Sequence, residues 1–221
     1  TPDQWLELAN HARARNLLFI SSPFSVKAVE ILERAGVDIY KVASGEINNK
    51  ILMDEISATR KAIILSTGMS PFTEIDDAVE SFTKKGCELA VLQCTSEYPV
   101  KPENLGLNLI REFKARYNLP VGLSDHSGNI FSGLASIALG ADLLEVHVTF
   151  SKDMFGPDVP ASITFEELSL LSDGAHWIKK AIMNPVDKDQ LANNFNNYRS
   201  IFMKSFVASE DIPKGTVITI N

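Results

Sequence analysis

The chain has 221 residues, 45% of them hydrophobic, which is enough for one core but too little for two large domains. Its net charge of −7, without a basic tract, argues against nucleic acid and acidic membrane surfaces as partners. Two cysteines do not make a disulfide framework, and no apolar run of about 18 residues or secretory signal is present, so we expect a cytoplasmic protein.

Apolar segments of strand length alternate with segments of helical periodicity through most of the chain. We expect strands at residues 17–22, 39–43, 62–66, 88–94, 120–124 and 142–148. We expect helices at residues 3–15, 25–35, 49–59, 73–85, 104–117, 129–139 and 164–183. Thr73 with nearby Asp76 predicts one helix start, and Thr164 with Glu167 predicts another through a capping box. The alternation indicates an α/β protein.

Each of the six predicted strands runs into polar side chains at its carboxyl end. In α/β barrels this end of the strands carries the active site. A (β/α)8 TIM barrel has eight strands and about 250 residues, so we interpret the chain as a TIM barrel that lacks its first two strands. An open doubly wound sheet is the alternative, but such a sheet gathers its ligand-binding groups at one switch point rather than along a whole rim.

The last part of the chain differs in composition. Residues 184–198, NPVDKDQLANNFNNY, are rich in Asn and Asp and only weakly periodic, which is typical of a linker. In residues 199–221 apolar residues alternate, and Pro-Lys-Gly at 213–215 predicts a turn between short strands. We therefore divide the chain into a barrel domain at residues 1–183, a linker, and the start of a small β-rich domain.

His126 and His147 stand at the ends of two consecutive predicted strands. Neighbouring strands lie about 4.8 Å apart, so both imidazoles could reach one ion. Two nitrogen ligands, with further positions left for oxygen, fit Mn²⁺, Mg²⁺, Co²⁺ or Zn²⁺. Asp125 and Glu145 flank the pair. The sequence therefore predicts a divalent metal site, and the alternative is two unrelated polar residues at loop starts.

Lys41 lies inside an apolar strand, where lysine is rarely buried unless it is paired. It could neutralise a phosphate or carboxylate, form a Schiff base, or extend outward to solvent. Serine recurs at or just beyond strand ends, at Ser22, Ser44, Ser66 and Ser124. Hydroxyl groups, free backbone amides and an ammonium group together predict a cradle for a phosphate-bearing substrate.

Three more residues are candidates for contact with a substrate. Glu46 lies beside the predicted cradle and could act as a general acid or base. Tyr98 could position a substrate or pack in a turn. Residues 154–162 follow the last predicted strand, contain Gly and Pro, and carry Asp158. We expect this segment to cover the mouth of the barrel.

Seven short motifs occur in a fixed order along residues 17–183. They are SSPFS at 21–25, YKVASGEINN at 40–49, LSTGM at 65–69, LQCTSEYP at 92–99, GLSDHSG at 122–128, EVHVT at 145–149 and MFGPDVPAS at 154–162. Together they resemble the sialic acid synthase family, the phosphoenolpyruvate-condensing N-acetylneuraminate synthases. Residues 199–221 resemble the opening of the antifreeze-like (SAF) domain that follows the barrel in that family.

The resemblance implies a metal-dependent condensation of phosphoenolpyruvate with the open-chain aldehyde of an N-acylated amino sugar, such as N-acetylmannosamine. The products would be a nine-carbon 2-keto sugar acid and phosphate. By resemblance, His126 and His147 bind Mn²⁺, with Mg²⁺ or Co²⁺ as alternatives. The resemblance also implies a homodimer in which the antifreeze-like domain reaches the partner's site.

The resemblance assigns roles to the other candidates as well. Phosphoenolpyruvate would be held by Lys41, Ser22, Ser44, Ser66, Ser96 and Ser124. Glu46 would handle a proton near the reacting carbons, with Lys41 as the second catalytic residue. Tyr98 and Asp158 would contact the sugar.

Two positions depart from the family, and several functions stay open. Ser96 stands where the family often has Asn, and Val146 where it often has Lys or Arg. The acceptor could instead lead to legionaminic or pseudaminic acid. Other classes are a Schiff-base aldolase using Lys41, a metal-dependent hydrolase, and a non-catalytic sugar-phosphate-binding protein.

Overall fold

The computed structural model describes residues 1–218 of the chain. These residues fall into two compact units, Thr1–Ile182 and the residues from Met183 onward. Every side chain proposed above for the site belongs to the first unit. No helix within the described part is both long and apolar enough to cross a membrane.

Seven parallel strands form one sheet in which each strand pairs with the next along the chain. The strands are β1 (Ile20–Ser21), β2 (Ile39–Val42), β3 (Ala62–Ser66), β4 (Leu89–Cys94), β5 (Val121–Asp125), β6 (Leu143–Val148) and β7 (Ser162–Ile163). A doubly wound sheet would reverse its strand order at a switch point. The unbroken order therefore argues against the open-sheet alternative.

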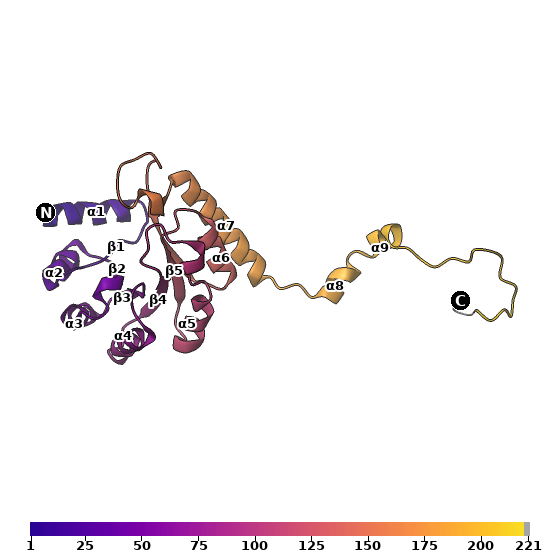
Figure 1. Ribbon diagram of the computed structural model, residues 1–221, viewed down its shortest axis with the longest axis horizontal. Helices are drawn as coiled ribbons and strands as arrows, with labels where there is room; N and C mark the ends of the chain where they lie inside the picture. Colours follow the sequence, from indigo (N-terminus) through magenta and orange to yellow (C-terminus); the bar gives the residue numbers. More distant parts are fainter. Residues whose placement is uncertain (219–221) are drawn as a thin grey trace. The chain divides into compact units, whose positions relative to one another are not determined.

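The sheet is curled. Lys41 of β2 forms an ion pair with Glu145 of β6 at 3.1 Å, although β3, β4 and β5 lie between these two strands in the sheet. Figure 1 shows α2 to α7 arranged around the outside of the strands. A curled parallel sheet with helices on its outer side is the arrangement of a TIM-barrel-like fold.

Strand β7 was not expected. The sequence pattern predicts six strands and leaves residues 154–162 in a loop, whereas the structure pairs His147 with Ser162 and Val148 with Ile163. A two-residue strand is too short to show an alternation of apolar and polar residues. Because β7 pairs with the last residues of β6, the loop between these two strands both starts and finishes at the carboxyl end of β6.

The helices of the first unit agree in number and order with the sequence pattern. They are α1 (Pro2–Ala14), α2 (Val26–Ala35), α3 (Lys50–Ala58), α4 (Phe72–Lys84), α5 (Leu109–Tyr117), α6 (Phe131–Ala138) and α7 (Phe165–Met183). Short 3-10 helices occur at η1 (Ser44–Glu46), η2 (Pro102–Asn104) and η3 (Val159–Ala161).

Of the two predicted helix starts, one is confirmed. The Glu167 amide donates to Thr164 Oγ1 at 3.3 Å, and the Thr164 amide donates to Glu167 Oε2 at 2.8 Å, which completes the capping box of α7. The helix predicted from residue 73 begins one residue earlier, at Phe72, but the cap predicted at Thr73 is wrong, because α4 has no side-chain cap. Asp76 instead accepts hydrogen bonds from two side chains of α5.

Alternation along β2 shows how the core and the site are separated. Tyr40 and Val42 are buried in the hydrophobic core. Successive side chains of a strand point to opposite faces, so Lys41 between them points to the inner face of the curled sheet. The polar residue interrupts the apolar run without disturbing the core.

The second unit contains two short helices, α8 (Lys188–Asn193) and α9 (Asn196–Phe202). The predicted linker is therefore partly helical, and Asp187 caps α8 by accepting from two backbone amides. Between residues 203 and 218 the structure has no strand, so the antifreeze-like domain and the boundaries proposed for it stay predictions. The end of the expected strand, at 219–221, lies outside the described residues.

Candidate active site

A cavity of about 420 Å³ opens on the inner face of the curled sheet, at the carboxyl ends of the strands. Eight of the residues proposed from the sequence line it: Lys41, Ser44, Ser66, Ser96, Tyr98, Ser124, His126 and His147. These residues lie on β2, β3, β5 and β6 or on the loops after the strands. Residues far apart in the sequence therefore share one cavity.

Three proposed residues are not part of the cavity lining. Ser22 follows β1 and is partly exposed. Glu46 ends η1, and its Oε2 accepts a hydrogen bond from Asn49 Nδ2 at 2.7 Å. Asp158 approaches the site through one contact, with its Oδ2 3.6 Å from His147 Nδ1.

Lys41 is 9% exposed and is paired, as its place in an apolar strand requires. Its Nζ lies 3.1 Å from Glu145 Oε1, and Ser124 Oγ donates to the same oxygen at 2.6 Å. Glu145 is therefore a site residue, although from the sequence it was expected only to flank the two histidines. The signal was present, because Glu145 lies two positions before His147 and so points to the same face.

Three side chains of the cavity lining converge on the backbone of Gly68, which itself lines a neighbouring hollow. The Gly68 amide donates to Ser44 Oγ at 3.0 Å, and Ser44 Oγ lies 3.6 Å from Cys94 Sγ. A Cβ on Gly68 would come within 2.5 Å of Ser96 Oγ and 2.8 Å of both Cys94 Sγ and Ser44 Oγ. The close approach therefore needs glycine. No local pattern identified Gly68 or Cys94 as site residues.

The two imidazoles lie together, as predicted from their strands. β5 and β6 are parallel neighbours, and the ring centroids of His126 and His147 are 5.1 Å apart at an interplanar angle of 89°. The ring of Tyr98 stacks on His126 with a centroid distance of 4.1 Å. Adjacent strands thus bring both rings to one side of the cavity.

His126 has the protonation state that a metal ligand needs. Its Nδ1 lies 2.9 Å from the carbonyl oxygen of Thr95, and because a carbonyl only accepts, Nδ1 carries the proton and donates. Burial lowers the pKa of His126 below its ordinary value; the hydrogen bond to Thr95 opposes this shift, and neighbouring His147 adds a smaller lowering effect. The ring is therefore neutral near pH 7 and Nε2 keeps its lone pair. Such a backbone acceptor is a common orienting partner of metal-bound histidine.

The donor set fits a divalent ion that also binds substrate oxygens. No group of three or more His, Cys, Asp or Glu side chains converges as a metal site anywhere in residues 1–218. His126 and His147 would then be the protein ligands, and the remaining coordination positions would be filled by oxygen. Mn²⁺, Mg²⁺ and Co²⁺ accept such mixed ligand sets.

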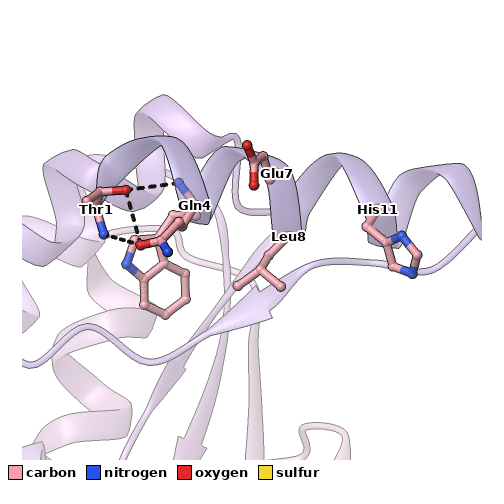
Figure 2. A pocket seen from close by; sticks show the side chains of 6 residues that line it. Thr1, Gln4, Glu7, Leu8 and His11 are labelled. Atoms are coloured by element: carbon pink, nitrogen blue, oxygen red, sulfur yellow. Dashed lines mark hydrogen bonds between the residues drawn. The ribbon is translucent and has the colours of Figure 1, made fainter.

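A separate hollow of about 650 Å³ lies along α1 and is lined by Thr1, Gln4, Trp5, Glu7, Leu8 and His11. In Figure 2 the Gln4 amide donates to Thr1 Oγ1 at 3.4 Å and the Thr1 amino group donates to Gln4 Oε1 at 2.7 Å, which together form the capping box of α1. None of the residues proposed for the site lines this hollow. The chemistry of the first unit is therefore concentrated at the strand ends.

The chain is similar to proteins of one known family. Residues 1–187 match the model of the NeuB family. The chain is 38% identical to N,N'-diacetyllegionaminic acid synthase of Campylobacter jejuni, over 96% of this chain and 64% of that protein. It is 30% identical to human N-acetylneuraminate-9-phosphate synthase, over 99% of this chain and 61% of that protein. The chain thus spans less than two thirds of these relatives.

A solved structure has the same fold. The crystal structure of N-acetylneuraminic acid synthetase from Leptospira borgpetersenii, in complex with citrate, superposes with a TM-score of 0.83 and 31% sequence identity. The match covers 93% of this chain and 72% of that one. The similarity therefore extends through nearly the whole first unit.

Proposed function

The chain belongs to the NeuB family, and we propose that the complete protein condenses phosphoenolpyruvate with an N-acylated amino sugar. The product would be a nine-carbon 2-keto sugar acid of the sialic acid type, with release of phosphate. The single observation that supports this best is the cavity in which a buried lysine and several serines lie beside a pair of imidazoles. An anion site next to a metal site suits a reaction between an acidic substrate and a carbonyl compound.

We assign phosphoenolpyruvate to the cradle around Lys41. Its ammonium group would donate charge-assisted hydrogen bonds, which are shorter and stronger than neutral ones. Hydroxyl donors would come from Ser44, Ser66 and Ser124, three residues of the same cavity wall. Ser22 and Ser96 complete the proposed set. The backbone amide of Gly68 already holds Ser44 in place and would preorganise the cradle.

We assign the amino sugar to the side of the cavity that holds the imidazoles. His126 and His147 would hold Mn²⁺, which supplies Lewis-acid polarisation of the sugar aldehyde. Tyr98 and Asp158 would contact the sugar and keep its aldehyde facing the cradle. Orienting two reactants in this way removes much of the entropic barrier of a bimolecular reaction.

The proposed reaction balances with water as the third reactant. C3 of phosphoenolpyruvate bonds to the aldehyde carbon, and the oxygen of water adds at C2 and becomes the keto oxygen as the C2–O bond to phosphate breaks. One proton of the water leaves with the phosphate, and the other balances the proton gained by the aldehyde oxygen. The aldehyde oxygen gains a proton to become a hydroxyl group. We propose that Glu46 donates this proton as a general acid. Glu46 lies in η1, which follows β2, two residues after Ser44.

A phosphate-release assay on the full-length protein tests the proposal. Phosphoenolpyruvate and Mn²⁺ would be offered with N-acetylmannosamine, its 6-phosphate, and the diacetamido sugars that lead to legionaminic or pseudaminic acid. We expect release that depends on one of these sugars and stops when a chelator removes the metal. Release without any sugar, or none with every sugar, would contradict the proposal.

A Schiff-base aldolase is the second candidate, because Lys41 is buried and stands at the cavity wall. Borohydride trapping with pyruvate separates the two reactions. A covalent adduct on Lys41 would support the aldolase. The ion pair with Glu145 favours the condensation, because a Schiff base forms from a neutral amine, whereas Lys41 is held here as the charged partner of a carboxylate. A sugar-phosphate-binding protein would instead bind both ligands without turnover.

A further inference from the structure

One loop joins β6 to η3 and carries Asp158, the residue proposed to contact the amino sugar. The side chain of Asp158 is 61% exposed, and its carboxylate lies 3.6 Å from His147 Nδ1. Packing therefore does little to hold this side chain. Its place beside His147 depends on how the backbone of residues 149–161 is held.

Lys152, near the start of this loop, joins three separate segments. Its Nζ donates to the carbonyl oxygen of Gly128 at 2.8 Å and to that of Ser162 at 2.6 Å, and lies 3.2 Å from Glu167 Oε2. These partners belong to the loop after β5, to β7 and to the first turn of α7. An ammonium group has three N–H donors, so these contacts use its full capacity.

Gly128 shows that the two loops also touch directly. It lies two residues after His126 and has a φ of +68°. A Cβ at this position would lie 2.1 Å from the carbonyl oxygen of Pro160, which belongs to η3. The loop that follows His126 and the loop that carries Asp158 therefore meet backbone to backbone. Lys152 ties the same two loops through the Gly128 carbonyl.

We propose that Lys152 is a positioning residue that holds the Asp158 loop against the His126 loop and so determines how well the amino sugar is bound. This inference rests on the proposed function, because it takes Asp158 as a sugar contact. Lys152 acts on the sugar side alone, since its three described partners include no residue of the anion cradle. Loss of the clamp should weaken sugar binding and leave phosphoenolpyruvate binding nearly unchanged.

The role differs from simple support of α7. Glu167 keeps a second partner when Lys152 is removed, because it also accepts from the Thr164 amide. That hydrogen bond, together with the one from Lys152, lowers the pKa of Glu167. The carbonyl oxygens of Gly128 and Ser162 would each lose the hydrogen bond from Lys152. Its removal should therefore loosen the His126 loop and the Asp158 loop rather than α7.

The kinetic test uses the full-length protein with Lys152→Met, Lys152→Arg and the control Lys84→Met. Lys84 pairs with Glu80 at 2.6 Å on the exposed side of α4, so the control removes an equal charge and an ion pair away from the cavity. We expect Lys152→Met to raise the KM for the sugar about tenfold while the KM for phosphoenolpyruvate changes less than about twofold. Arginine should restore part of the sugar affinity, because a guanidinium can donate to two carbonyls.

Amide hydrogen exchange makes the test independent of turnover. Lys152→Met should speed exchange in residues 127–130 and 150–161 and leave α4 unchanged. Equal rises in both KM values, no change in either, or unchanged exchange in both loops would overturn the inference. If the wild-type protein condenses no sugar, the proposed function fails, and the exchange result still decides whether Lys152 clamps the two loops.

Discussion

The two halves of the candidate site are held in different ways. In the cradle, Lys41, Ser66 and Ser124 are strand residues with exposed fractions of 9%, 2% and 3%. On the sugar side, the side chains of His147 and Asp158 are 32% and 61% exposed. Strand pairing and burial therefore hold these three cradle residues. On the sugar side, His147 is also a strand residue but is more exposed, and loop contacts hold Asp158.

This difference suits the chemistry proposed for each half. The proposed reaction uses phosphoenolpyruvate with each candidate acceptor, while the candidate acceptor sugars differ in their substituents. A site built on strands is more precise than one built on loops, and loops tolerate sequence change better. We therefore expect substitutions in the cradle to act on phosphoenolpyruvate and substitutions in the loops to act on the sugar.

The largest effect is expected on the sugar side, at His126. It is 4% exposed, its ring stacks on Tyr98, and it would be one of two protein ligands of the ion. His126→Ala should lower Mn²⁺-dependent phosphate release at least about 100-fold. Even the loss of a residue that only orients a metal ligand lowers metal affinity or activity about 10–100-fold. Phosphate release and the melting temperature of the full-length protein would be measured together.

The control for this variant is His176→Ala, which removes an exposed imidazole from α7. It should leave both measurements near the wild-type values. A normal rate for His126→Ala would end the metal assignment. A large fall in melting temperature for that variant alone would mean that His126 supports the fold instead.

Lys41→Ala should raise the KM for phosphoenolpyruvate about tenfold or more, since a hydrogen bond to a charged group contributes about 1.5–3 kcal/mol. The KM for the sugar serves as the internal control and should change little. Steady-state kinetics with each substrate varied in turn would measure both. An unchanged KM for phosphoenolpyruvate would remove Lys41 from the cradle.

Gly68→Ala should raise the same KM about fivefold, because overpacking costs about 1–3 kcal/mol and the new methyl group would meet three cradle side chains. Gly45→Ala is the matched variant, since its Cβ would meet only Met69 Cε, at 3.7 Å. We expect a smaller effect there. If the two alanines raise the KM equally, the fit around Gly68 has no special importance for the cradle.

The smallest effect is expected away from both halves, at Asp142 before β6. Burial would raise the pKa of Asp142, but Lys114 and the Val121 amide outweigh it and hold the pKa below its ordinary value. A carboxyl group with a lowered folded-state pKa stabilises the protein above its unfolded pKa, and this is lost as the pH falls through the folded value. Because the side chain is 39% exposed, the contribution should stay within about 1 kcal/mol.

Thermal melting of Asp142→Asn against wild type would measure this contribution. The variant should melt lower at pH 7, and the difference should shrink below about pH 4, where the wild-type carboxyl becomes protonated. Both KM values should stay unchanged. The same difference in melting temperature at pH 3 and pH 7 would show that the charge of Asp142 does not stabilise the fold.

Local patterns predicted the helices and longer strands of the first unit well, because each element there has its own periodicity and stop signals. The capping box at Thr164 is an example. The pattern failed where an element was too short, as in β7, or where composition was ambiguous, as in α8 and α9. Asn-rich segments favour loops and caps about equally, and here Asp187 provides a cap.

The sequence by itself determined six of the seven strands of the sheet and which polar residues stand at their ends, because burial on both faces requires apolar runs and makes a polar residue within a run easy to see. Only the tertiary structure decided which of these ends meet. Lys41 reaches Glu145 because the sheet curls, Gly68 matters because three side chains converge on it, and Lys152 joins loops that no local pattern connects. Such contacts depend on the geometry of the curled sheet, which no single segment encodes.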